Sequence, residues 1–315
     1  MTTIELSTLS SRISLGTSQT FRNLMVVPLL DPSSPTAGWL TLDDALARGV
    51  TEITEVSEAG SVPQLRLLNR GDEPVFLLDG EELVGAKQNR ILNLSILVPE
   101  RTNLEIPVSC VEQGRWSWRS AGFSSADRVI YSKLRRNNAE AVTRSLASVG
   151  DRRGDQGTVW EDIASKSARM SVHSDTGAAS AMYERYREDL DEFVSSIEAA
   201  PGQVGAAFVV NGRFAGLDLL AGTDLLARLL PKLVRSYALD AIDGDEAGSR
   251  RGGADMEGIR AIEAALQGVA HMTTASHTAI GRGKDLRLKG GGLVGGALIA
   301  EGALVHLGIW SAAYH

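Results

Sequence analysis

The sequence predicts an α+β protein, in which an antiparallel sheet built from hairpins carries helices packed on one side. Two observations predict this class. Apolar and polar residues alternate in much of the chain before Ser124, and this is the period of half-buried strands. In residues 126–200 and 224–267, apolar residues recur at helical spacing instead. Strands and helices that are segregated in this way are typical of α+β proteins.

The first part of the chain predicts short strands and one helix. The continuous apolar run at 23–30 predicts a buried strand, and residues 51–57 and 64–69 predict two more strands. Thr41 has the side chain of a helix N-cap, and the short helix that follows it is expected to end at Arg48.

The central stretch predicts two hairpins. Asp79 and Gly80 lie between apolar runs and form a dipeptide that favours a two-residue turn. Residues 90–98 and 102–110 alternate strictly, so each predicts a half-buried strand, and the proline-containing segment between them predicts the turn. This pairing would bring residues 87–90 next to residues 110–116.

The second half predicts a helical insertion at about 124–200, with helices near 126–146, 158–169 and 178–199. Asn211 and Gly212 form the preferred turn of another hairpin, and a helix starts at Thr223. The Gly-rich and charge-rich stretches 147–157 and 243–255 predict mobile loops. We expect residues 1–315 to form a single α+β domain that contains this insertion.

Composition limits the classes of function. The chain is 43% hydrophobic and 23% charged, as expected for a soluble globular protein, and its net charge of −7 disfavours a nucleic-acid partner. The N-terminus has no signal-peptide pattern, and the apolar C-terminal stretch is interrupted by Glu301 and His306, so we expect a cytoplasmic protein that does not enter a membrane. Composition indicates neither a cofactor nor an oligomeric state.

The cysteine and the histidines predict little chemistry. Cys110 is the only cysteine, which excludes an intrachain disulfide. It shares a strand face with apolar residues, so we assign it to the core. The five histidines show no metal-binding spacing, and we expect no metal site.

The strongest functional signal is a group of polar and aromatic residues at one end of the central strands, which we call the polar cluster. A site for a small polar molecule needs such groups on rigid elements. Arg90 is expected either to pair with Glu112 or to clamp an anionic ligand. The ligand-binding candidates are Glu81, Lys87, Gln88, Asn89, Arg90, Arg115 and Trp116, and the candidate catalytic acids are Glu82 and Glu112.

Two stretches resemble a known family. They are L-L-D-G-E-E-L-V-G-A-K-Q-N-R with the later I-P-V-S-C-V-E-Q-G-R-W, and G-A-A-F-V-V-N-G-R-F-A-G-L-D-L-L from Gly205. Both resemble the domain family named for its association with ADP-ribosylglycohydrolases and rhodanese-phosphatase proteins. The resemblance implies a context of NAD and ADP-ribose utilisation, and it implies no particular reaction.

Three functions follow as alternatives. The first is binding of a nucleotide-like small molecule such as ADP-ribose, which the resemblance implies. The second is a hydrolase that uses Glu82 or Glu112 as a general acid or base on such a ligand. The third is a structural or interaction protein in which the polar cluster is a buried network. A carboxylate of raised pKa in an open pocket would favour the enzyme, and a closed, fully paired cluster would favour the structural alternative.

Overall fold

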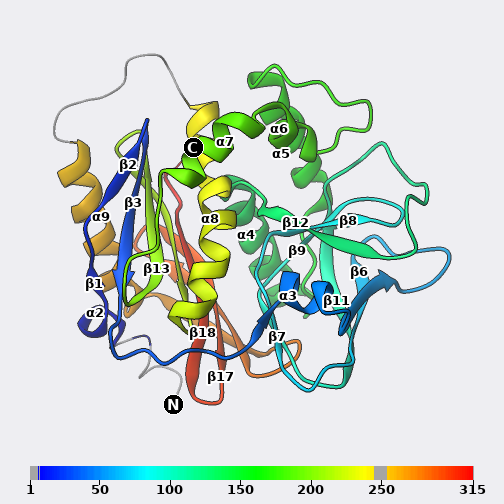
Figure 1. The fold of residues 1–315 in the computed structure, drawn as a ribbon, viewed down its shortest axis with the longest axis horizontal. Helices are drawn as coiled ribbons and strands as arrows, with labels where there is room; N and C mark the ends of the chain where they lie inside the picture. Colours follow the sequence, from blue (N-terminus) through cyan, green and yellow to red (C-terminus); the bar gives the residue numbers. More distant parts are fainter. Residues whose placement is uncertain (1–5, 7, 245–253, 315) are drawn as a thin grey trace.

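The computed structural model describes residues 6, 8–244 and 254–314, and it confirms the α+β class. Three sheets, almost entirely antiparallel, form a large layer and a smaller lobe beside it, with helices around them (Figure 1). None of the helices in these ranges is long and apolar enough to cross a membrane.

The large sheet combines the two ends of the described chain. Its order is β1-β3-β13-β14-β18-β17-β16-β15, with β2 paired to β3, and every pairing is antiparallel. The Asn211–Gly212 turn between β13 and β14 is confirmed, and both residues have positive φ. The strands are β1 (Ser14–Leu15), β2 (Gln19–Phe21), β3 (Leu24–Leu30), β13 (Gln203–Val210), β14 (Arg213–Leu220), β15 (Thr273–Thr278), β16 (Lys284–Gly290), β17 (Leu293–Ala300) and β18 (Ala303–Ser311).

The smaller lobe contains the other two sheets. A six-stranded sheet has the order β12-β8-β9-β11-β6-β5, and a three-stranded sheet has the order β10-β7-β4. The strands are β4 (Leu40–Thr41), β5 (Thr51–Glu55), β6 (Gln64–Asn69), β7 (Val75–Leu77), β8 (Glu81–Gly85), β9 (Arg90–Leu92), β10 (Ile96–Val98), β11 (Thr102–Cys110) and β12 (Phe123–Val129).

Helices cover both faces of the large sheet, whereas the sequence predicted them on one side. Ala206 and Phe208 of β13 pack in the same cluster as α8, and Ala207 and Val209 of that strand pack in the cluster that contains α9. Figure 1 shows α8 and α9 on opposite sides of the strands. The helices are α2 (Leu9–Arg12), α3 (Leu42–Ala47), α4 (Ser132–Ser148), α5 (Gln156–Arg169), α6 (Ser180–Arg185), α7 (Arg187–Ser195), α8 (Thr223–Asp243) and α9 (Ala254–Val269).

The predicted strand at 90–98 is broken, which corrects the hairpin about Pro99. Residues 93–95 leave the strand, so β9 pairs with β8 and β11, while β10 pairs with β7 in another sheet. The turn at Asp79 and Gly80 likewise connects two sheets instead of pairing β7 with β8. Arg90 nevertheless lies opposite Cys110, as predicted.

Several predicted bounds also change. Residues 123–129 form β12, so the helix expected at 126–146 begins at Ser132. The helix expected at 178–199 is divided at Tyr186 into α6 and α7. Thr41 caps α3 with a capping box, as predicted. Of the predicted loop at 243–255, residues 245–253 lie outside the described part of the chain.

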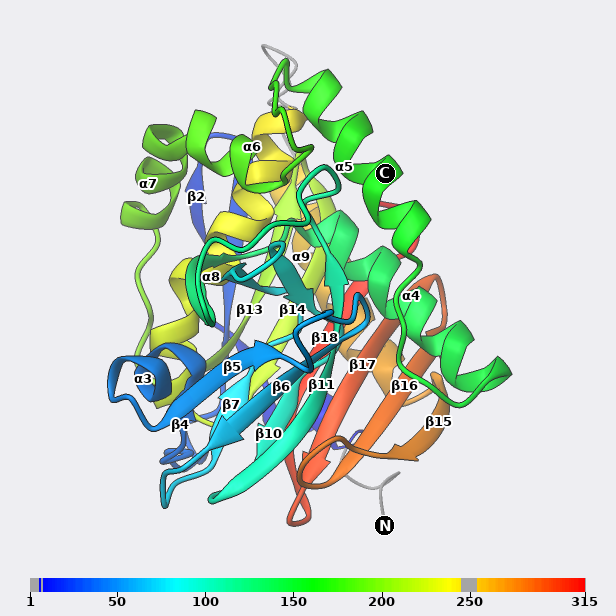
Figure 2. The ribbon, with the colours of Figure 1, turned by 90° about the vertical axis from the view of Figure 1, so that its right-hand side faces the viewer.

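The segment between α4 and α5 lies against the smaller lobe. The main-chain oxygen of Arg152 accepts a hydrogen bond from Asn93 (2.9 Å), and the Asp155 side chain caps α5. Figure 2 shows α4 beside β16 and β17, with α5 above it. The predicted mobility of 147–157 stays a prediction.

Candidate functional site

The polar cluster forms, and its centre is a closed network. Glu112 is 2.6 Å from Arg115, and Glu82 is 2.6 Å from Arg128, so each buried acid has its own arginine. Asn89 joins the two pairs, because it donates to Glu82 (3.1 Å) and accepts from Arg115 (3.1 Å). The expected pair of Arg90 with Glu112 does not form, since Arg115 takes that position.

Each carboxylate of the polar cluster is bound by a buried or mostly buried cation. Burial alone would raise the pKa of Glu112, but the hydrogen bonds from Arg115, Asn89 and Thr176, together with the charge of Arg115, outweigh burial and lower the pKa. Glu81 points elsewhere and binds Lys232 of α8 at 2.8 Å. Burial raises the pKa of Glu81, yet its side chain is fully enclosed. Catalytic roles for Glu82 and Glu112 stay a prediction that this geometry does not favour.

The remaining members surround the network. Lys87 donates to two main-chain oxygens, of Glu58 and Ala59. Gln88 accepts hydrogen bonds from Arg90 (2.9 Å) and from the thiol of Cys110 (3.0 Å). Burial raises the pKa of the Cys110 thiol, as expected for a core cysteine.

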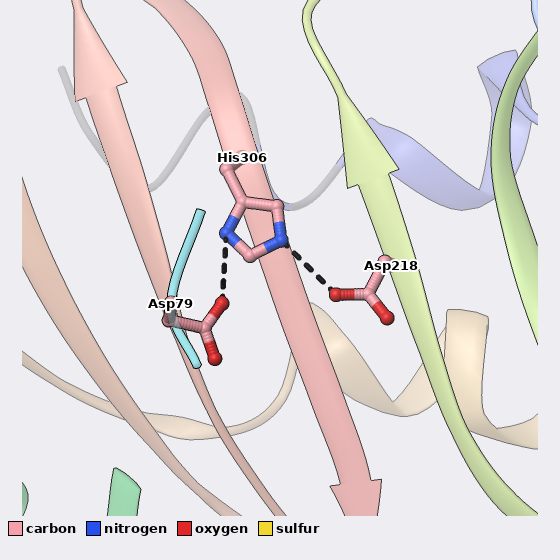
Figure 3. Close-up of side chains that lie close together, drawn as sticks. All are labelled: Asp79, Asp218 and His306. Atoms are coloured by element: carbon pink, nitrogen blue, oxygen red, sulfur yellow. Dashed lines mark hydrogen bonds and ion pairs between the residues drawn. The ribbon is translucent and has the colours of Figure 1, made fainter. Parts of the chain in front are cut away.

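A second group, which the sequence did not predict as a site, lies between the large sheet and the smaller lobe. We call it the His306 cluster. It joins three elements and two connecting segments, because Asp218 lies on β14, His306 on β18 and Arg135 on α4, while the other two residues lie just before β8 and β10. Figure 3 shows three of its side chains converging. The members are Asp79, Ser95, Arg135, Asp218 and His306.

His306 connects a hydroxyl to a carboxylate. Its Nδ1 is 2.9 Å from Ser95 Oγ, and its Nε2 is 3.1 Å from Asp218 Oδ1. Asp79 Oδ1 is 3.7 Å from Nδ1, and the Asp79 main-chain N–H donates to Ser95 Oγ at 2.9 Å. If Nε2 carries the proton and donates it to Asp218, Nδ1 is free to accept a proton from Ser95. Serine, histidine and aspartate therefore form one hydrogen-bonded chain.

Arg135 compensates the negative charge of the two aspartates in the His306 cluster. Its guanidinium is fully buried and binds Asp218 at 2.7 Å and Asp79 at 2.9 Å. Burial alone would raise the pKa of Asp218, but Arg135 and His306 outweigh burial and lower the pKa to about 2. Asp218 is therefore ionised near neutral pH and lies within hydrogen-bonding distance of Nε2 of His306.

The His306 cluster borders a small cavity of about 20 Å³. A cavity needs roughly 10–15 Å³ to hold one water molecule, so this cavity has room for one. Nε of Arg287 and Nε1 of Trp310 are buried and have no hydrogen-bond partner in the described part of the chain. Further lining residues are Asp79, Asn93, Ser95, Asp285 and His306.

The same cluster meets the distance condition for a metal site. Ligand atoms of Asp79, Asp218 and His306 lie within 4.8 Å of one another. The guanidinium of Arg135, however, already bridges the two carboxylates and compensates their charge. The residues present therefore fit a hydrogen-bonded acid–base cluster better than an ion-binding one.

A comparison with family models identifies the chain. Residues 12–310 match the model of the ARG and Rhodanese-Phosphatase-superfamily-associated Protein domain, ARPP-1. The chain belongs to the ARPP-1 family. The family name indicates association with proteins of the ADP-ribosylglycohydrolase type. Searches of the curated proteins and of the solved structures found no match.

In this ARPP-1 domain, the three acids of the D-G-E-E motif form ion pairs with three cations that lie on different elements. Asp79 binds Arg135, Glu81 binds Lys232 and Glu82 binds Arg128. The sequence indicated Asp79 only as a turn residue, and it gave His306 no role. Asp218 and His306 each interrupt an apolar strand pattern, and a polar group that is buried in this way needs a partner. That interruption was the available sequence signal for both residues.

Proposed function

We propose that this ARPP-1 domain binds a nucleotide-like ligand such as ADP-ribose at the His306 cavity and hydrolyses a bond in it. The observation that carries this proposal is the chain from Ser95 through His306 to Asp218 at the wall of a cavity with room for one water. The class of ligand is supported by the family name alone.

The proton path follows from the hydrogen bonds. A water in the cavity transfers a proton to Ser95 Oγ as the Ser95 proton passes to Nδ1 of His306. The hydroxide formed attacks the ligand, and the imidazolium later returns the proton, through Ser95, to the leaving group. Asp218 stabilises the imidazolium and keeps the ring oriented, as a buried carboxylate beside a catalytic histidine does.

The lining supplies contacts for a polar ligand. Nε of Arg287 and Nε1 of Trp310 donate no hydrogen bond, and Oδ2 of Asp285 accepts none, among the residues that the structure describes. The ligand reaches them once the segment around Arg152 is displaced, because Arg152 bonds Asn93 and lies 3.5 Å from Asp285.

The test is incubation of the purified chain with ADP-ribose, NAD and ADP-ribosylated peptides, with products followed by mass spectrometry. We expect turnover by the native chain and a loss of about 10²–10⁴-fold in His306→Gln and in Ser95→Ala, typical of lost acid–base catalysis. His271→Gln, at an exposed position, is the matched control and keeps full activity. Thermal melts establish that each variant is folded.

Three outcomes would count against the proposal. Absence of both binding and turnover with all these compounds overturns it. Undiminished turnover in His306→Gln would show that His306 is not the general acid and base of the reaction. Saturable binding without turnover overturns the hydrolase and leaves the binding function.

A further inference from the structure

A buried ion pair in the polar cluster is left incomplete. Arg90 is fully buried, and its Nη2 is 3.9 Å from Oε1 of Glu55, whose side chain is only 2% exposed. Nε and Nη2 of Arg90 and both carboxylate oxygens of Glu55 have no hydrogen-bond partner within the ranges that the structure covers. Native proteins rarely leave so many polar atoms buried without a hydrogen bond, because each such atom loses the hydrogen bonds that it made with water and gains none in return.

The neighbouring pairs show that this separation is unusual here. Glu112 approaches Arg115, and Glu82 approaches Arg128, to 2.6 Å in both cases. Arg90 is held away from Glu55 by its hydrogen bond to Gln88 (2.9 Å). The cluster therefore contains two completed pairs and one pair whose facing atoms stay available.

An aromatic side chain covers the incomplete pair. The ring of Trp116 lies over the Arg90 guanidinium, with 5.6 Å between Cζ and the ring centroid. Gly60, which has positive φ, lies between this ring and Glu55, and an added Cβ would be within 3.3 Å of both. Trp116 is 47% exposed on an irregular segment, so it separates the pair from solvent without being part of the core.

The charges of the two residues select the ligand. An anionic group would be repelled by Glu55, and a cationic group by Arg90. A primary carboxamide is neutral, and its oxygen accepts from Arg90 while its nitrogen donates to Glu55. These two atoms lie about 2.2 Å apart, from standard C=O and C–N lengths. Nη2 of Arg90 and Oε1 of Glu55 are 3.9 Å apart. The carboxamide oxygen and nitrogen can therefore lie beside these two atoms, with one hydrogen bond to each.

We propose that Glu55 and Arg90 form a second binding site, separate from the His306 cavity, for a flat ligand with a primary carboxamide, and that Trp116 closes over its ring. Trp116 lifts to admit the ligand and then stacks on it. The site is independent of the proposed hydrolase, because none of its three residues belongs to the His306 cluster.

The test is isothermal titration calorimetry of the full chain with benzamide, benzoate and benzylamine, which share a ring and differ in charge. We expect saturable binding of benzamide that is at least about tenfold tighter than that of the other two compounds, because each charged group meets a buried like charge. Equal affinity for the three compounds, or no binding of benzamide, overturns the proposal.

Two tryptophans provide a matched pair of variants. Trp116 and Trp118 are similarly exposed (47% and 51%), and both contact Lys87, but we identify only Trp116 over Arg90. Trp116→Ala should weaken benzamide binding at least about tenfold, a typical loss for a stacking ring, while Trp118→Ala changes it little. Both variants should fold, because neither ring is core. Equal effects of the two variants overturn the role of Trp116.

A variant of the pair and a crystal structure complete the test. Glu55→Met removes the acceptor for the carboxamide nitrogen and should abolish benzamide binding, and its thermal melt establishes folding. Ser95→Ala should leave benzamide binding unchanged, which separates this site from the His306 cavity. A crystal structure grown with benzamide that shows only a water between Arg90 and Glu55 overturns the proposal.

Discussion

Buried or mostly buried arginines hold the acids of both the polar cluster and the His306 cluster in place. Arg135 compensates two carboxylates at the His306 cluster, and Arg115 and Arg128 each compensate one acid of the polar cluster. A buried ion pair contributes little net stability relative to apolar residues, but the removal of one partner leaves an uncompensated charge. These arginines therefore fix where the acids point.

At this scale we predict that Arg135→Met lowers the free energy of unfolding by about 3–5 kcal/mol near neutral pH. The reason is that Asp79 and Asp218 lose their shared cation in a site that water scarcely reaches. Urea denaturation followed by circular dichroism measures the change. Arg144→Met on the same helix is the control, because Arg144 is 64% exposed and should change stability by less than about 0.5 kcal/mol. Equal effects of the two variants would show that Arg135 is dispensable.

At the scale of elements, the segment between α4 and α5 contacts two residues that line the His306 cavity, because Arg152 accepts a hydrogen bond from Asn93 and lies 3.5 Å from Asp285. Gly154 lies so close to Asn138 and Ser109 that a Cβ would overlap both side chains. Those side chains are held in place, because each contacts Oδ1 of Asn93 at 3.1 Å or less. The segment thus lies on a rigid polar surface that only glycine can approach.

We therefore predict that Gly154→Ala lifts this segment and speeds amide hydrogen exchange in residues 150–157 by about 10–100-fold, as expected for an overpacked contact that costs about 1–3 kcal/mol. Hydrogen-exchange mass spectrometry measures it. Gly157→Ala serves as control, since its added Cβ would meet only Asp155, at an ordinary 3.6 Å. Unchanged exchange in Gly154→Ala would mean that the neighbouring side chains yield instead.

At the scale of the whole molecule, the His306 cluster forms only where the large sheet and the smaller lobe pack together. Asp218 and His306 lie on adjacent strands of the large sheet, whereas Asp79 and Ser95 belong to the smaller lobe. Folding of both parts is needed before Arg135 can bind its two acids. The charge state of Asp218 is consequently coupled to global unfolding.

The pH dependence of stability follows from that coupling. Asp218 has its pKa lowered from 3.8 to about 2 in the folded state. A lowered pKa contributes stability that is present above the unfolded value and is lost as pH falls from 3.8 toward 2. The loss is about 2 kcal/mol.

Urea denaturation between neutral pH and about pH 2 measures this loss, and Asp218→Asn should lack this part of the pH dependence while being less stable at neutral pH. Parallel pH curves for native and variant chains would contradict the low pKa of Asp218.

Local patterns in the sequence determined the α+β class, the capped helix after Thr41 and the Asn211–Gly212 hairpin, because each depends on neighbouring residues alone. The alternation at 90–98 did not reveal a change of sheet at residues 93–95, since a strand pattern is the same whichever partner it has.

The polar cluster was also accessible from sequence, because its residues lie close to one another in the chain, on neighbouring strands and the segments that follow them. The layer of helices on both faces of the large sheet and the entire His306 cluster were decided only by tertiary structure. Asp79 precedes Asp218 by 139 residues (218 − 79), and Asp218 precedes His306 by 88 (306 − 218). No local signal reports that two strands and a turn will bring their ligand atoms within 4.8 Å of one another. Long-range pairing of strands creates that proximity, and the buried Arg135 makes it stable.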